Sequence, residues 1–359
     1  MTYLDYQATT PLAPEAFEAM LPWLRDQHAN PHSSHRAGRA AKAAVEVARE
    51  QVAALLPDGG TVSFTSGATE ALNWAIKGVG GPVVTLATEH AAVLDTVATI
   101  AESTLLPVGR DGLVDLEAAR AAIGPGTRLV AAMLVNNEIG VIQPIADLAA
   151  MAHAAGALFL CDAVQGYGRV PIPDGCDLIA LSAHKVYGPK GIGALWIRDG
   201  VSLAPLLHGG HQEAAGRSGT LSPALCAGFG TAAALMTARA DGDARHVDRL
   251  WAVALDTLGK DWTVNGSTEH RYRGNLNIRR DGLDVARLMS DLRDIAFSAG
   301  SACASGSGRT SHVLRAIGLS DAGAKSSIRL GVGRYTTEAE LIDALTRIGA
   351  AARAQRVAA

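Results

Sequence analysis

The sequence predicts an α/β fold: a largely parallel sheet covered by helices on both faces, followed by a smaller α+β unit. Between residues 61 and 197, short apolar runs alternate with amphipathic segments at helical spacing, which is typical of a parallel sheet with crossover helices. After about Thr220 the alternation fades, and a long helical pattern at 233–258 precedes further strand-like runs. We therefore expect two structural units.

The elements follow in order from this spacing. After an extended start, apolar residues at helical spacing predict a long amphipathic helix over 33–56 that ends near Pro57. In the sheet region, helices are expected to begin at Ala68, Ala91 and Ile145. The strands between them are expected at 61–65, 83–88, 128–135, 157–163, 177–183 and 193–197. The second unit is expected to contain strands at 275–280 and 326–333, a helix at 284–292, and a capped helix after Thr336 or Thr337.

Composition excludes several function classes. The 359 residues include 32 Lys and Arg against 35 Asp and Glu, a net charge of −3, so the basic surface typical of nucleic-acid or anionic-membrane binders is not expected. The start has no signal-peptide pattern, and no apolar run reaches the ~18 residues that span a bilayer. We expect a cytoplasmic protein with a small-molecule partner.

Polar side chains follow the predicted strands at the point where each strand ends. In open α/β sheets this edge is where ligands bind, so these residues are expected to converge on one site. A lysine between a buried strand and a Gly-rich turn, next to His184, can have its pKa lowered enough to form a Schiff base. The residues concerned are Thr69, His90, Asn137, Asp162, Gln165 and Lys185.

Each of these residues also has a plainer interpretation. The turn at 65–70 can hold a phosphate at a helix N-terminus or can simply begin a helix. Asp162 on a buried strand needs a cationic partner, such as a protonated pyridine nitrogen or a metal, unless it only begins a turn. His90 can stack on a ring, and Asn137 can offer its amide to a ring substituent, but either residue can also be a capping group.

The four cysteines differ in their surroundings. They are widely spaced and form no CxxC pair, so neither a metal site nor a disulfide framework is expected. Cys161, Cys176 and Cys226 lie in or near apolar runs and are expected to be buried. Cys303 lies in the Gly/Ser-rich stretch 298–308 and is expected to be an exposed, mobile nucleophile, or otherwise an incidental linker thiol. Further along, Arg329 can hold a substrate carboxylate or take part in a structural ion pair.

Taken together, these motifs make the chain resemble the NifS/IscS-type cysteine desulfurases, which belong to the class V aminotransferases among fold type I pyridoxal-phosphate enzymes. The resemblance covers nearly the whole chain in collinear order. It rests on YLDYQATTPL, NPHSSHRAGR, FTSGATE, TEHAAVLD, VNNEIGVIQPI, CDAVQ, SAHKVYGPKGIGAL, HGGHQEAAGRSGT, SAGSACASG and SSIRLGVGRYTTEAE.

The resemblance implies a fold, a cofactor and a reaction. The fold would have a large domain of residues 14–240 with a mainly parallel seven-stranded sheet, and a small domain of 1–13 with 241–359 that carries the Cys303 loop. The cofactor would be pyridoxal 5'-phosphate, and the reaction would convert L-cysteine to L-alanine while Cys303 takes the sulfur as a persulfide. A sulfur-acceptor protein, in iron–sulfur cluster assembly or thiolation, would receive it.

The resemblance also assigns roles to single residues. Lys185 would form the Schiff base, Asp162 would pair with the pyridinium nitrogen, and His90 would stack on the ring and relay protons. The ring hydroxyl side would be contacted by Asn137 and Gln165, and the substrate carboxylate by Arg329 with the Asn30 segment nearby. The phosphate would be held by Ala68, Thr69, Ser182 and His184, and by Thr220 from the second subunit of a homodimer.

Two other activities share these cofactor residues: selenocysteine lyase and class V aminotransferase. Cys303 argues against plain transamination. An interaction protein that keeps the fold without turnover is a third alternative, but both Lys185 and Asp162 are present.

Overall fold

The computed structural model describes residues 1–100, 102–300 and 310–357. Its larger sheet has the strand order β2-β8-β7-β6-β5-β3-β4, in which β8 runs antiparallel to both neighbours and the other pairs are parallel. The predicted mainly parallel seven-stranded sheet is confirmed. Its strands are β2 (Gly60–Thr65), β3 (Val83–Leu86), β4 (Ser103–Leu106), β5 (Leu129–Met133), β6 (Leu158–Asp162), β7 (Leu178–Ser182) and β8 (Gly193–Arg198).

Helices cover both faces of this sheet, so its strands are apolar on both sides. Along β6, Phe159 and Cys161 belong to one hydrophobic cluster, whereas Leu160 belongs to the other. This double burial explains why the strands appear in the sequence as continuous apolar runs rather than alternating patterns. The helices of this part of the chain are α2 (Arg36–Ala53), α3 (Ala68–Val79), α4 (Ala91–Val97), α5 (Leu116–Ala122), α6 (Ile145–Ala154), α7 (Pro223–Leu258) and α1 (Pro14–Arg25), which packs on α7.

The long helix α7 begins earlier than the predicted segment 233–258. Ser222 caps it by accepting a hydrogen bond from the Leu225 N–H, and Pro223 occupies its first turn, a combination that starts helices efficiently. Helices α1 and α2 pack against it. A Cβ on Gly230 would lie 2.6 Å from Cα of Ala48, so the close approach of α7 to α2 requires a glycine at this position.

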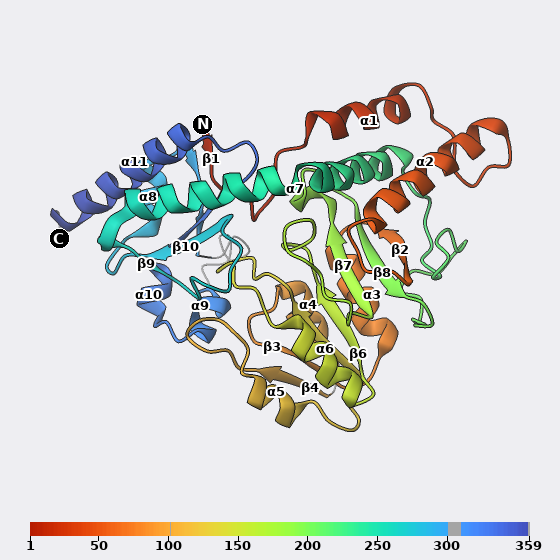
Figure 1. The fold of residues 1–359 in the computed structure, drawn as a ribbon, viewed down its shortest axis with the longest axis horizontal. Helices are drawn as coiled ribbons and strands as arrows, with labels where there is room; N and C mark the ends of the chain where they lie inside the picture. The colour runs from red at the N-terminus through yellow and green to blue at the C-terminus, as the bar shows by residue number, and fades with distance from the viewer. Residues whose placement is uncertain (101, 301–309, 358–359) are drawn as a thin grey trace.

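The second sheet is antiparallel, with the order β12-β13-β10-β9, and it has its own hydrophobic cluster. Helix α7 reaches both units: Phe229 packs in the first cluster and Leu250 in the second, as its course in Figure 1 shows. The predicted boundary at residue 240 therefore falls inside a continuous helix, and the division into two domains stays a prediction. The remaining elements are β1 (Thr2–Tyr3), β9 (Thr263–Val264), β10 (Asn275–Arg279), α8 (Val285–Asp291), β11 (Ile295–Ala296), β12 (Ser298–Ala299), α9 (His312–Ala316), α10 (Asp321–Lys325), β13 (Ser327–Gly331) and α11 (Glu338–Val357).

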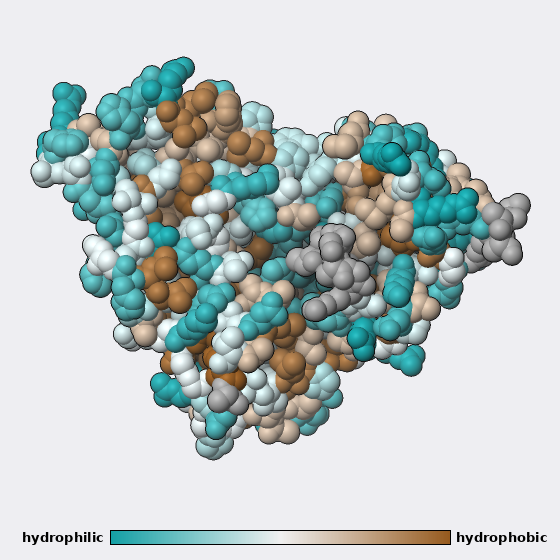
Figure 2. All heavy atoms as spheres, turned by 180° about the vertical axis from the view of Figure 1, so that it is seen from behind, coloured by the Kyte–Doolittle hydropathy of each residue, from teal (hydrophilic) through white to brown (hydrophobic). Residues whose placement is uncertain are grey.

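On the face seen in Figure 2, hydrophobic residues form patches interrupted by hydrophilic ones. Within the described ranges, no helix combines the length and apolar character that crossing a bilayer requires.

Candidate active site

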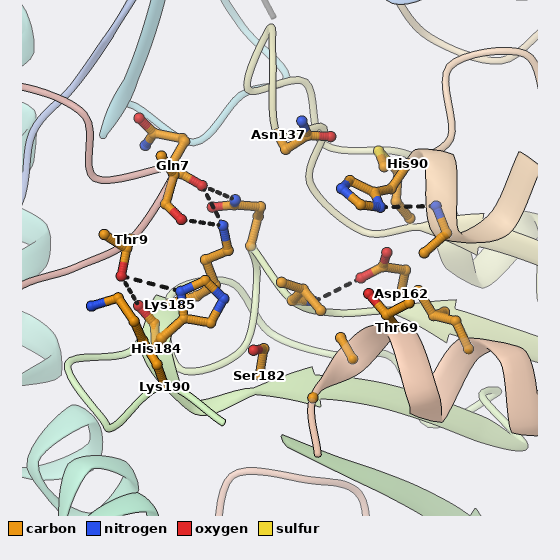
Figure 3. A pocket seen from close by; sticks show the side chains of 18 of the residues that line it. Gln7, Thr9, Thr69, His90, Asn137, Asp162, Ser182, His184, Lys185 and Lys190 are labelled. Carbon is orange, nitrogen blue, oxygen red and sulfur yellow. Dashed lines mark hydrogen bonds between the residues drawn. The ribbon is translucent and has the colours of Figure 1, made fainter. Parts of the chain in front are cut away.

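A cavity of about 570 Å³ opens where the parallel strands end. It brings together the six polar residues that the strand ends predicted, namely Thr69, His90, Asn137, Asp162, Gln165 and Lys185. Ala68, Ser182, His184 and Arg329 line it as well. Figure 3 shows Lys185 on one side of this cavity and Asp162 and His90 on the other.

Lys185 ends the short 3-10 helix Ala183–Lys185 that follows β7. Its Nζ donates hydrogen bonds to the carbonyl oxygens of Gln7 at 2.6 Å and Ala8 at 2.8 Å. These carbonyls hold the amine at the cavity wall, and both belong to the N-terminal segment, 177 or more positions away in the sequence.

His184 faces the same segment and is uncharged at neutral pH. Burial, with the nearby charges of Lys185 and Lys190, lowers its pKa to about 4. Its Nδ1 lies 3.1 Å from Oγ1 of Thr9. The neutral imidazole can donate or accept a hydrogen bond, but it adds no cation to the site.

Asp162 ends β6, and it is 6% exposed. Its Oδ1 accepts a hydrogen bond from the Val164 N–H at 3.0 Å. Burial raises its pKa, while the charges of His90 and Lys185 and the bond from Val164 act in the opposite direction. A cationic N–H placed beside this carboxylate would offset the cost of burying it, so a protonated pyridine nitrogen fits the residue.

His90 caps helix α4, and this cap fixes which of its two ring nitrogens accepts a hydrogen bond and which carries the proton. Nδ1 accepts a hydrogen bond from the Ala92 N–H at 3.1 Å, so in the neutral ring the proton is on Nε2.

The preceding Glu89 is fully buried, and its Oε1 accepts a hydrogen bond from the Met133 N–H at 2.7 Å. Burial, and then the charge of Asp162, raise the pKa of Glu89 well above its usual value.

The start of helix α3 fits a phosphate. Its N-cap residue, Gly67, has no side chain to satisfy the first N–H groups of the helix, and a Cβ there would meet only open space. The helix has 12 residues, and Ala68 and Thr69 of its first turn line the cavity. Unsatisfied N–H groups and the positive end of the helix dipole favour an anion at this place.

Gln165 offers an acceptor for a ring hydroxyl. Its Nε2 donates to the Gln7 carbonyl at 2.9 Å, whereas its Oε1 is buried and meets no hydrogen-bond donor among the described residues. A buried acceptor without a donor is costly, so a hydroxyl donor at the cavity would stabilise it. The acceptor at Gln165, the carboxylate at Asp162 and the phosphate cradle at α3 therefore fit the predicted cofactor.

Arg329 takes part in an ion pair, which is one of its two predicted roles; its contact with a substrate carboxylate stays a prediction. It forms an ion pair with Asp5, from Nη2 to Oδ1 at 2.8 Å, and its Nη1 donates to the Asn137 carbonyl at 3.0 Å. It is 1% exposed, yet it lines the cavity. Its buried Nε has no hydrogen-bond acceptor among the described residues, so the guanidinium retains a donor for a carboxylate.

The N-terminal segment contributes to the cavity in a way that no side-chain pattern predicts. Gln7, Ala8 and Thr9 line the cavity and bind Lys185, Gln165 and His184. The Lys185 contacts use backbone carbonyl oxygens, which every residue carries, so no side-chain pattern marks them. The one available signal is the polar run of Gln7, Thr9 and Thr10 between Tyr6 and Pro11.

Two predicted site residues do not line the cavity of a single chain. Asn30 is exposed, and its Oδ1 accepts a hydrogen bond from the His32 N–H at 2.8 Å. Thr220 is exposed as well, and its predicted place is the cavity of a second subunit. Both assignments stay predictions.

The prediction that Cys161, Cys176 and Cys226 are buried is confirmed. Cys303 lies outside the described residues. In the parts of the chain that the structure describes, no group of three or more His, Cys, Asp or Glu side chains is arranged to hold a metal ion.

Comparisons with known proteins show the family to which the chain belongs. The family model "Aminotransferase class-V" matches residues 2–345. The "Cysteine desulfurase IscS" of Rickettsia bellii (strain OSU 85-389) is 43% identical over 360 residues, which cover 94% of this chain and 88% of the relative. The solved structure of a NifS-like protein from Rickettsia africae ESF-5 has a TM-score of 0.91 at 30% identity and covers 98% of this chain and 99% of its own. A structure titled "SspA in complex with cysteine" has a TM-score of 0.84 at 34% identity, and the match covers 94% of this chain and 100% of that structure's chain.

Proposed function

The chain belongs to the class V aminotransferase family, and from this premise we propose that it is a pyridoxal-phosphate-dependent cysteine desulfurase that converts L-cysteine to L-alanine. The similarity to cysteine desulfurases extends over most of the chain. The observation in the site that carries the proposal is the convergence of Lys185, Asp162 and the start of α3 on one cavity. This set provides an amine, a buried carboxylate and an anion cradle in one place.

The described residues would hold the cofactor at three points. Lys185 Nζ would bind it covalently, Asp162 would face its ring nitrogen, and the first turn of α3 would take its phosphate with Ser182 and His184. When bound, pyridoxal 5'-phosphate withdraws electrons from the α carbon of an amino acid, so that a proton there becomes acidic.

The protein's own groups then act in a physical order. Arg329 binds the carboxylate of L-cysteine, and the Lys185 amine removes the Cα proton. His90 relays protons at Nε2, because Nδ1 is engaged by the Ala92 N–H. The carboxylate of Asp162 would stabilise the positive charge of the protonated ring nitrogen that it faces.

Sulfur transfer requires a thiolate from the protein. In the proposal, the Cys303 thiolate attacks the substrate sulfur, so that an S–S bond forms while the Cβ–S bond breaks. The electron pair of the broken bond stays with Cβ, which is then protonated, and the proton that Lys185 removed returns to Cα to give alanine. Cys303 is left as a persulfide, and an acceptor protein receives the sulfur for iron–sulfur cluster assembly or thiolation.

We also propose a cytoplasmic homodimer in which Thr220 of one copy completes the phosphate site of the other. Thr220 is exposed in the single chain, so it is available for this contact.

The test measures sulfide and alanine from L-cysteine with a thiol reductant. Wild type should be yellow and form both products in equal amounts. Cys303→Ala should keep the colour and form neither product, while Cys226→Ala, which removes a buried thiol, should remain active. A colourless protein that pyridoxal phosphate does not colour would refute the cofactor assignment, and a fully active Cys303→Ala would refute the persulfide step. With a 2-oxo acid added, loss of L-cysteine without formation of sulfide, together with the amino acid that corresponds to the added 2-oxo acid, would favour transamination.

A further inference from the structure

The turn at residues 136–139, between β5 and α6, joins the two sheets. Oδ1 of Asn136 closes the turn by accepting hydrogen bonds from the N–H groups of Glu138 at 2.9 Å and Ile139 at 3.0 Å. The carbonyls of residues 137, 138 and 139 accept hydrogen bonds, at 3.0, 3.0 and 2.8 Å, from the side chains of Arg329, Asn277 and Arg271. This turn therefore helps to set where Arg329 lies relative to the cavity.

Glu138 is the acidic residue of this turn, and it does not line the cavity. Its side chain is buried, with the residue 3% exposed, and its Oε2 accepts a hydrogen bond from Oγ of Ser311. Ser311 in turn caps helix α9 by accepting from the Leu314 N–H at 3.0 Å. The carboxyl of Glu138 thus fixes the turn to the start of α9.

The charged groups that act on Glu138 come from two other elements. They are Arg329 on β13 and His90 ahead of α4. Burial raises the pKa of Glu138 to about 7, although the Ser311 hydrogen bond and these two charges act to lower it. The carboxyl group therefore changes its charge close to neutral pH, beside the arginine assigned to the substrate.

The charge around Arg329 depends on this change. When Glu138 is neutral, Asp5 is the carboxylate paired with the guanidinium. When Glu138 ionises, a second negative charge acts on the same buried guanidinium. An incoming substrate carboxylate is then repelled more strongly, because buried charges are poorly screened.

We propose that Glu138 is a positioning residue for Arg329: its carboxyl group fixes the 136–139 turn to α9 and, when ionised, weakens the binding of the substrate carboxylate. This inference rests on the proposed function, in which Arg329 binds that carboxylate. Because such coupling is reciprocal, binding of the carboxylate also favours the protonated form of Glu138.

The experiment measures KM and kcat for L-cysteine with the holoenzyme between pH 5.5 and 8.5. In wild type, KM should rise as pH passes through about 7, by roughly five- to tenfold for a coupling of ordinary size. In Glu138→Gln, which keeps an acceptor for Ser311 but carries no charge, this rise should be absent and kcat should change little. Glu117→Gln, which removes an exposed carboxylate on α5, should behave as wild type. Titration of the substrate itself affects all variants equally.

Ser311→Ala provides a second, independent test. The Ser311 hydrogen bond favours the ionised form of Glu138, so its loss should raise the pKa and move the increase in KM to higher pH. Identical KM profiles for wild type, Glu138→Gln and Ser311→Ala would overturn the inference.

Arg329→Gln separates this inference from the proposed function. A large rise in KM at all pH values supports the role of Arg329, and the Glu138 result then stands by itself. An unchanged KM would refute the assignment of Arg329 to the substrate carboxylate, and the Glu138 inference with it.

Discussion

Replacing Glu138 by Gln should change how the stability of the fold depends on pH, whatever the protein catalyses. The carboxyl group is buried, and burial raises its pKa from 4.5 to about 7. In the unfolded chain it titrates near 4.5. The folded chain therefore keeps this proton over a pH range in which the unfolded chain has lost it.

The sign and size of the effect follow from this difference. Because the folded-state pKa is the higher one, the contribution of Glu138 to the unfolding free energy is fully present below pH 4.5. This contribution is lost progressively as the pH rises to about 7, and no more of it is lost above that pH. A shift from 4.5 to about 7 corresponds to roughly 3 kcal/mol of unfolding free energy. The amide of Gln does not titrate, so Glu138→Gln should gain about this amount relative to wild type between pH 4.5 and 8.

Urea unfolding at half-unit pH steps, followed by circular dichroism, measures this difference. Only the change with pH is predicted, since the constant difference also contains the altered hydrogen bond to Ser311. Glu117→Gln is the control, because its exposed carboxylate should give a nearly parallel curve. If the curves of wild type and Glu138→Gln are parallel over the whole range, Glu138 does not titrate as the burial argument requires.

Two further predictions concern the cavity. Asp162→Asn should still bind the cofactor through Lys185 and the start of α3. It should lose the charge that stabilises the ring nitrogen, and it should therefore form alanine about 10²- to 10³-fold more slowly. Visible absorption measures cofactor binding and an alanine assay measures the rate; a colourless variant or an unchanged rate would contradict the assignment. His90→Asn retains a capping side chain for α4, whereas His90→Ala loses it, so only the alanine variant should lose about 1 kcal/mol of stability. Both variants should lose proton relay and slow alanine formation by about 10²-fold or more; equal thermal stability of the two would show that the Nδ1 hydrogen bond to Ala92 contributes nothing.

The sequence predicted the core of the site because parallel strands end at one edge of a sheet. His90, Asp162 and Lys185 each follow a buried apolar run, so their convergence required only the strand assignments and the rule for parallel sheets. Arg329 was harder to place. It lies on a strand of the other sheet, and local pattern does not show that the 136–139 turn brings it to the same cavity.

Several elements of the fold had no clear pattern in the sequence. Helix α1 lies in the part of the chain before position 33, for which the sequence predicts an extended start, and it contains Pro22, which ordinarily breaks helices. The start of α7 was placed ten residues too late, although Ser222 and Pro223 form a recognisable helix start. The short strands β9, β11 and β12 have two residues each, too few to show a periodicity.

The N-terminal segment contacts both Lys185 and Arg329, which line the same cavity. Strand β1 pairs with β11, which places the first residues beside the second sheet. Within five positions, Asp5 pairs with Arg329, Gln7 and Ala8 hold the Lys185 amine, and Thr9 contacts His184. The arginine lies on a strand of the second sheet, and the lysine follows a strand of the first, so their separation depends on how the two units are held together. Because the N-terminal segment forms hydrogen bonds to both Lys185 and Arg329, a change in the position of either unit must move the Lys185 amine and the Arg329 guanidinium together.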